Sequence, residues 1–242
     1  MVGQADESGN EYQATESPVS WEQRFWQFSQ DVAGTLLRPA ETLRDIGRRE
    51  AIISALALVV LFSGISVVTQ LVSWVLSTTG IAGFDSPAMP YADQSIAATQ
   101  LTGILWGVVW APVAWTLMAV ALYAAAYFLG GRGRFAAVWA ATGFALTPQL
   151  IVAPLTGVNQ MLGVLGTGWQ LFGWIVLLPA TVGAFIWTVV LSMIAIRETM
   201  GLSTGRAIGS LAILFALILM IVVLIVCLVG MMFVALGLVR GS

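Results

Sequence analysis

The chain has 242 residues, of which 59% are apolar and only 9% are charged, whereas roughly a quarter of the residues of a soluble domain are charged. All ten cations are arginines and histidine is absent, so the net charge of −2 combines an acidic N-terminal segment with arginine-bearing loops. The single cysteine, Cys227, excludes a disulfide within the chain. Long uncharged apolar runs after residue 50 predict an all-α, polytopic membrane protein.

Residues 1–20 are acidic and show no periodicity, which predicts a disordered tail. This segment lacks the basic start and the early apolar core of a cleavable signal peptide. The first apolar run begins only at Ala51, so we expect the first span to act as its own uncleaved signal.

Residues 21–50 predict two amphipathic helices at the cytoplasmic membrane interface. In the first, Trp21, Phe25, Phe28 and Val32 recur at helical spacing and form one aromatic face. This face could pack against the bundle, lie in the headgroups or recruit a partner. The polar side of the helix lacks the cations of a strong lipid-surface anchor.

The second amphipathic helix is expected from Pro39 to Glu50, because proline suits the first helical position. Asp45 precedes Arg48 by three residues and Arg49 by four, which is pairing distance on a helix. Four arginines lie close before the first span, where arginine sets the orientation of a membrane protein. They are Arg38, Arg44, Arg48 and Arg49.

A five-helix transmembrane domain is predicted over residues 51–240, with Gln70 as the only strongly polar side chain of its first span. The stretch 94–129 exceeds the roughly 20 residues that one span needs. We therefore expect an interfacial start and then a span bent near Pro112. Residues 156–168 are uncharged and rich in glycine, which predicts a loop. The predicted spans are about 51–76, 103–129, 135–155, 169–196 and 207–239.

Arginine placement predicts the orientation of these spans. Arg132 and Arg134 lie between the second and third spans, and Arg197 and Arg206 lie between the fourth and fifth. Alternation places both loops on the same side as residues 1–50, and that side holds nine of the ten arginines. Because arginine-bearing loops stay in the cytoplasm, we expect a cell-membrane protein with a cytoplasmic N-terminus and an external C-terminus.

Most catalytic arrangements are excluded by composition. Without histidine or lysine there is no Ser-His-Asp triad, no imidazole base and no Ser-Lys dyad, and one cysteine cannot form a thiolate zinc site. No predicted span contains an ionisable residue in its interior, as ion-coupled carriers usually do. We therefore expect no enzymatic activity, no metal, no cofactor and no nucleic-acid partner.

The third predicted span is interrupted by Thr147, Pro148 and Gln149. Pro148 has no N–H, so the carbonyl of Phe144 loses its helical partner and needs another in lipid, which Thr147 or Gln149 could supply. The break, with Gly143 one residue before Phe144, could form a pocket for a substrate or partner. It could equally be a structural kink packed against another span.

Small residues recur at a spacing of four in three places, which allows helices to approach closely, and the second span has Gly103 and Gly107. The third span has Ala137, Ala141 and Ala145, and the loop and start of the fifth have a glycine at 201, 205 and 209. Packing within the chain and homo-oligomerisation are both compatible with this pattern.

These segments, in this order, resemble the Yip1 family of multi-span membrane proteins over roughly residues 36–236. The resemblance rests on the Pro39 segment, five spans, the turn Gly130–Phe135, the loop Leu202–Ala207, and Gly143–Pro148, which is similar to the family's Gly-Tyr-x-x-x-Pro motif with Phe144 in place of tyrosine. It implies a five-helix bundle with the N-terminus inside and the C-terminus outside.

In eukaryotes the family is tied to vesicle traffic and Rab GTPases, with an Asp-Leu-Tyr-Gly-Pro motif before the first span. This chain keeps only the proline of that motif, in Leu37-Arg38-Pro39, so Rab binding is not carried over. The chain looks like a prokaryotic member of the family.

Two hypotheses of function follow. The first is a non-enzymatic scaffold or adaptor that presents a cytoplasmic surface to a protein partner or to membrane lipid. The second is a transport component that binds or passes a neutral solute near the kinked third span. The surface of the first hypothesis comprises Trp21, Phe25, Phe28, Val32, Arg38, Pro39, Arg44, Arg48, Arg49, Arg132, Arg134, Arg197 and Arg206.

Overall fold

The structure is a computed structural model that describes residues 20–78, 92–162 and 167–240. The described part is entirely helical, as predicted. The predicted tail of residues 1–20 lies outside this part except for Ser20. Ser20 caps the first helix in both directions. Its hydroxyl accepts from the backbone N–H of Gln23, and the Gln23 side chain accepts from the backbone N–H of Ser20.

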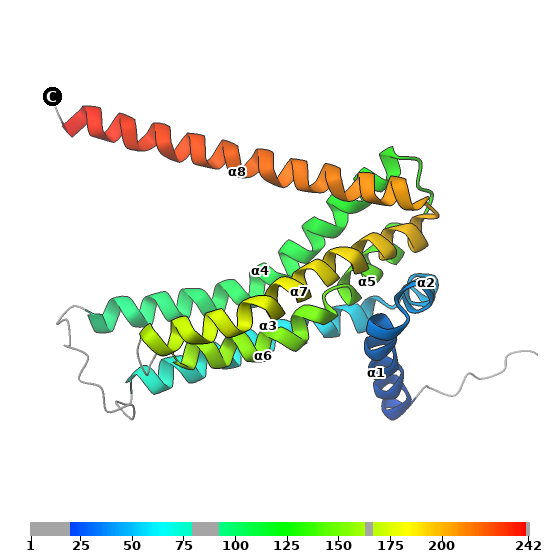
Figure 1. The fold of residues 1–242 in the computed structure, drawn as a ribbon, viewed down its shortest axis with the longest axis horizontal. Coiled ribbons are helices and arrows are strands. Elements are labelled where there is room, and N and C mark those ends of the chain that lie inside the picture. The colour runs from blue at the N-terminus through cyan, green and yellow to red at the C-terminus, as the bar shows by residue number, and fades with distance from the viewer. Residues whose placement is uncertain (1–19, 79–91, 163–166, 241–242) are drawn as a thin grey trace, which may run out of the picture.

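Two short helices precede the spans. Helix α1 runs from Trp21 to Leu37 and α2 from Pro39 to Arg49, with the proline in the first turn of α2 as predicted. Both lie at one end of the molecule, and α1 runs across the direction of the long helices (Figure 1). The chain leaves α2 through Glu50, whose left-handed backbone (φ 47°) turns it sharply into the first span.

Five segments are long and apolar enough to cross a membrane, as predicted. The first two are α3 and α4, and α4 is one continuous helix that contains Pro112 and bends along its length in Figure 1. The third span is broken into two helices, and the fourth and fifth are single long helices. The bounds are Ile52–Thr78 for α3, Ala92–Phe128 for α4, Phe135–Phe144 for α5, Thr147–Leu162 for α6, Thr167–Met200 for α7 and Thr204–Arg240 for α8.

Part of the predicted loop over residues 156–168 is wrong. Helix α6 continues through Thr156 and Gly157 to Leu162, although glycine favours loops. Packing explains the difference, because a Cβ atom at Gly157 would collide with Thr69 of α3. This glycine serves close helix contact inside the bundle instead of a turn.

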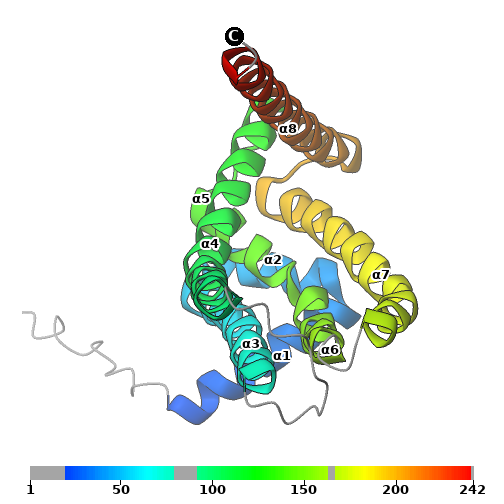
Figure 2. The ribbon, with the colours of Figure 1, turned by 90° about the vertical axis from the view of Figure 1, so that its left-hand side faces the viewer.

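The core surrounds the broken third span. Helix α5 contacts α2, α3, α4 and α7, and Ala137, Ala141 and Ala145 are all buried. Seen along the bundle, α8 stands apart from α3 and α6 at the far edge (Figure 2). Its main contacts are with α4 and α7, near its own N-terminal end. The small-residue pattern of the third span therefore packs within the chain.

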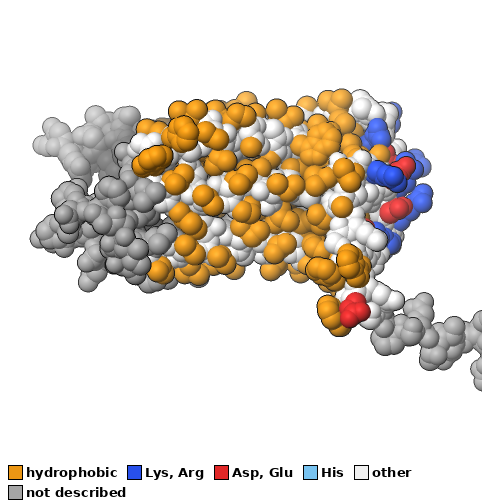
Figure 3. Space-filling model, turned by 60° about the horizontal axis from the view of Figure 1, so that its bottom comes forward, with side chains coloured by type: hydrophobic (Ala, Val, Ile, Leu, Met, Phe, Trp, Pro, Cys, Tyr) orange, Lys and Arg blue, Asp and Glu red, His pale blue; other side chains and the backbone are white. Residues whose placement is uncertain are grey.

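Charged side chains gather at one end of the molecule, beyond a broad apolar band (Figure 3). The band is formed by side chains of the spans, many of which are more than one-third exposed. Such a surface is stable only when hydrocarbon covers it. The protein is therefore an integral, multi-pass membrane protein.

Candidate functional site

The break in the third span satisfies its own backbone. Helix α5 ends at Phe144 and α6 begins at Thr147, and the Thr147 hydroxyl donates to the Phe144 carbonyl at 2.6 Å. This is the carbonyl that Pro148 leaves without a helical partner. The prediction that Thr147 could supply the missing donor is confirmed.

The surroundings of the break are densely packed. Phe144 and Thr147 are fully buried, and a Cβ atom at Gly143 would lie 2.9 Å from Ala55 of α3. The ring of Phe28 on α1 lies 6.2 Å from the ring of Phe144. The Gln149 amide donates to the Thr188 hydroxyl of α7 at 3.4 Å. These contacts are those of a structural kink at which four elements meet.

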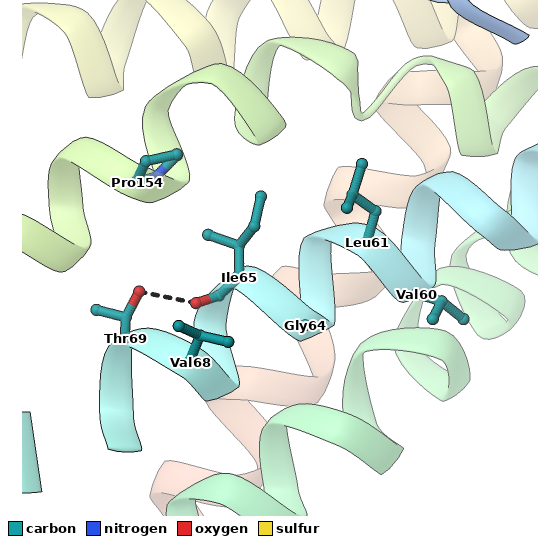
Figure 4. A pocket seen from close by; sticks show the side chains of 7 residues that line it. All are labelled: Val60, Leu61, Gly64, Ile65, Val68, Thr69 and Pro154. Carbon is teal, nitrogen blue, oxygen red and sulfur yellow. Dashed lines mark hydrogen bonds between the residues drawn. The ribbon is translucent and has the colours of Figure 1, made fainter. Parts of the chain in front are cut away.

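Two spaces lie between α3 and α6, nearly two helical turns beyond the break. One is a cavity of about 150 Å³ with mainly polar walls, lined by Ser66, Thr69, Gln70, Ala153, Thr156 and Gly157. The other is an open apolar groove of about 590 Å³ whose walls include Gly64, Ile65 and Pro154 (Figure 4). Thr69 borders both, and its hydroxyl donates to the Ile65 carbonyl. The polar cavity has room for a small neutral solute and offers it hydroxyl and amide groups.

At the charged end, the glycine turn between α4 and α5 packs against the end of α7. Gly130 has a φ of 91°, which glycine adopts without a steric penalty. A Cβ atom at Gly131 would lie 2.8 Å from Met200, and one at Gly133 would collide with the Thr199 carbonyl. The Arg132 N–H donates to the Met200 carbonyl at 3.2 Å. The turn between α4 and α5 is therefore held against the C-terminal end of α7, although the two segments are far apart in the sequence.

Ion pairs join these two segments to α2 and to Glu50, which follows α2. Glu198 accepts from Arg44 of α2 and from its neighbour Arg197, each at 2.6 Å. Arg134 pairs with Glu50 at 2.5 Å. The three predicted arginine segments thus meet at one end, and carboxylates hold them in place.

Arg49 pairs with Asp31 of α1 at 2.8 Å. The predicted helical pairing of Asp45 with Arg49 is therefore replaced by a contact between α1 and α2. Asp31 is buried, so its ion pair is the less screened of the two arrangements. A spacing rule on one helix could not find a partner that comes from another helix.

A polar crevice of about 350 Å³ lies between α2, α5 and α7 at this end. Arg48 lines it and forms no ion pair with any residue that the structure describes. Sequence reasoning named the arginines here but missed both carboxylates. Glu198 carried a signal, since it is the only acidic residue after Asp93. The crevice is lined by Arg44, Gly47, Arg48, Glu50, Arg134, Ala137, Glu198 and Thr199.

The predicted aromatic face of α1 is divided between two environments. Phe28 and Val32 pack against the core around Phe144. Trp21 and Phe25 are 76% and 59% exposed, and the neighbouring Trp26, which the sequence reasoning did not single out, is 65% exposed. One half of α1 therefore fixes the helix to the bundle, while the other half presents three aromatic rings.

The remaining predicted arginines lie on the surface of the same end. Arg38 separates α1 from α2 and is exposed, and Pro39 follows it as the first residue of α2. Arg132 and Arg206 are also exposed, and the Arg206 guanidinium lies 3.5 Å from where a Cβ atom of Gly130 would be. Arg206 thus lies over the turn between α4 and α5.

The comparison with protein families matches the Yip1 domain over residues 33–226. No curated protein and no solved structure matches the chain. The matched region includes the C-terminal end of α1, all of α2 and the four spans from α3 to α7, together with much of α8. It also contains the glycine turn, the helix break and the crevice. The chain therefore belongs to the Yip1 domain family of multi-pass membrane proteins, which are generally non-catalytic.

Proposed function

We propose that this protein is a non-enzymatic membrane scaffold whose arginine-rich end binds a protein partner at the membrane surface. The observation that carries the proposal is the convergence of three separate arginine segments on one end. The Arg44–Glu198 and Arg134–Glu50 pairs and the Arg132–Met200 backbone bond hold them there.

The charge at this end favours a partner with an acidic surface. Nine arginines and six carboxylates lie in its described segments, which leaves a formal excess of three positive charges. Arg38, Arg132 and Arg206 are exposed and form no ion pair within the described part of the chain. Such a surface steers an acidic partner and raises the rate of encounter.

The exposed turn of α1 supplies the apolar part of the proposed surface. Trp21, Phe25 and Trp26 lie at the start of a helix that is fastened to the bundle at its other end. Tryptophan and arginine are enriched among the residues that dominate binding energy. Because α1 is already ordered, binding would not have to bear the entropy of folding it.

Affinity capture from native membranes tests this proposal with matched variants. Replacing Arg132 and Arg206 together by glutamine should remove a captured partner, because the positive surface is lost without disturbing an ion pair. A control with Gly230→Ala on lipid-exposed α8 should capture the same partner as the unaltered protein. Capture that is unaffected by the arginine changes would contradict the proposal.

The proposal places this end in the cytoplasm, because arginine-bearing loops remain there. A variant without Cys227 offers a direct test through single cysteines. Ser203→Cys, at the charged end, should react with an impermeant maleimide only after the cells are opened. Ser86→Cys, in the segment outside the described residues, should react on intact cells. The reverse pattern would overturn the orientation.

The second candidate is transport of a small neutral solute, which the polar cavity between α3 and α6 favours. Ser66, Thr69 and Gln70 give that cavity hydrogen-bonding groups within the apolar band. Flux of a neutral solute in proteoliposomes should then fall when Gln70 is replaced by leucine and persist in the double arginine variant. A scaffold gives no flux in either case.

A further inference from the structure

The crevice at the charged end combines positive charge with a restricted space. Its lining includes Arg44, Arg48 and Arg134 against Glu50 and Glu198, which leaves one formal positive charge. Arg197, outside the lining, also pairs with Glu198 and raises the local excess to two. The space of about 350 Å³ is comparable in size to small-ligand pockets. An anion is therefore the expected kind of ligand.

The hydrogen-bonding capacity of the crevice is unevenly used. Glu198 accepts from Arg197 at one oxygen and from Arg44 at the other, so two guanidinium groups neutralise it. Arg134 gives one contact to Glu50 and is 80% exposed, so most of its N–H groups face outward. Arg48 spends no N–H group on a carboxylate that the structure describes. Arg48 and Arg134 therefore retain donors for a ligand.

Unused guanidinium N–H groups in a crevice with excess positive charge favour an oxyanion as the ligand. The planar fork of arginine matches the geometry of phosphate and carboxylate oxygens. A phosphodiester carries one negative charge, which an excess of one or two positive charges can balance. Close packing of α2 against α7 forms one side of the crevice. Gly47 permits it, because a Cβ atom at this position would lie 2.7 Å from the methyl group of Thr199.

The position of the crevice indicates where the phosphate comes from. It lies where two spans begin, because Glu50 of its lining lies just before the first span and Arg134 directly precedes the third. Ile53 is 78% exposed and follows Glu50 within one turn, and Phe135 is 37% exposed and directly follows Arg134. A phospholipid presents a phosphate beside hydrocarbon in this way, whereas soluble phosphate gains nothing from the apolar border.

We propose that Arg48 and Arg134 bind the phosphate of an anionic phospholipid in the crevice between α2, α5 and α7. The lipid chains lie along the apolar surface that begins at Ile53 and Phe135. This site is separate from the protein partner proposed above, since it uses the rim of the membrane and not the exposed surface of Arg132 and Arg206.

Native mass spectrometry of the purified full chain tests the site with two lipids of identical chains, phosphatidylglycerol and phosphatidylcholine. The unaltered protein should retain phosphatidylglycerol preferentially. Arg48→Gln should lower its retention roughly fivefold, as expected for the loss of one arginine near a lipid surface. Arg132→Gln removes the same charge from the same end outside the crevice, and it should change retention by less than about twofold.

A gain of binding excludes misfolding as the explanation. Glu50→Gln removes a negative charge from the crevice and releases Arg134, so retention of phosphatidylglycerol should rise. Equal losses in Arg48→Gln and Arg132→Gln, or equal retention of both lipids, would overturn the proposal. Displacement of the lipid by millimolar inorganic phosphate would assign the site to the free anion and would also overturn it. Partner capture by the unaltered protein is independent of all these outcomes.

Discussion

The third and fifth spans of this protein are made of apolar residues, yet they occupy opposite environments. In the most apolar stretch of the third span 61% of the residues are buried inside the protein, whereas in that of the fifth only 6% are buried. The third span is the less apolar of the two. An apolar span is therefore compatible with lipid and with the protein interior alike, and its burial depends on how closely helices can pack against it.

Small side chains separate the two spans more clearly than hydropathy does. Ala137, Ala141 and Ala145 are buried where α5 meets four other helices. The glycines at 201, 205 and 209 have the same spacing, but a Cβ atom at Gly205 would meet nothing within 4 Å. The pattern permits close packing, and a neighbouring helix has to be present for the packing to occur.

The largest difference is expected from removing one phenyl ring in each span. Phe144→Ala in the third span should cost about 3 to 5 kcal/mol, because the ring is fully buried and leaves a cavity. Phe215→Ala on α8, where the ring is 45% exposed, should cost well under about 1 kcal/mol. Apparent Tm values of the detergent-purified proteins give the order. Equal shifts would show that α8 is buried in the protein's native assembly.

Overpacking should give the next largest difference. Gly143→Val should cost about 1 to 3 kcal/mol, because its Cβ atom would lie 2.9 Å from Ala55 and 3.0 Å from Trp115. Gly230→Val on α8 meets open space and should leave the apparent Tm unchanged. A loss of stability in Gly230→Val would mean that something outside this chain packs there.

The helix break allows a finer test. Thr147→Val should cost about 1 to 2 kcal/mol, because the buried Phe144 carbonyl loses its donor. Thr147→Ser restores the hydroxyl and should recover most of the stability. Thr181→Val is the control, since the Leu177 carbonyl that Thr181 contacts keeps its helical partner. A neutral Thr147→Val would show that another group satisfies the carbonyl.

The smallest effects on stability are expected at the charged end, where the third and fifth spans begin. Arg134→Gln, at the start of the third span, should cost less than about 1 kcal/mol, because its ion pair with Glu50 is largely exposed. The effect should fade as salt is added. Arg206→Gln, in the first turn of α8, should have no measurable effect on Tm. A larger loss of stability in Arg206→Gln than in Arg134→Gln would contradict this expectation.

The sequence predicts which arginines gather at the candidate site, but it does not predict which carboxylates most of them pair with. Arginine counting placed Arg44, Arg134 and Arg197 on one side because a rule about charge and bilayers applies to any chain. Arg44 and Arg134 meet Glu198 and Glu50, which lie far from them in the sequence, so no spacing on one helix could reveal these two pairs. Gly157 shows the same limit, since its role depends on Thr69, almost ninety positions earlier in the chain.

The sequence by itself determined the number of spans and the break at Pro148, and it limited the repairing donor to Thr147 or Gln149, since each follows from local backbone chemistry in a medium without water. Only the tertiary structure decided which span is central, which carboxylate each arginine meets and where a crevice opens. These features depend on contacts between distant segments. Because lipid is as apolar as the side chains, the hydropathy of a span carries no information about its neighbours.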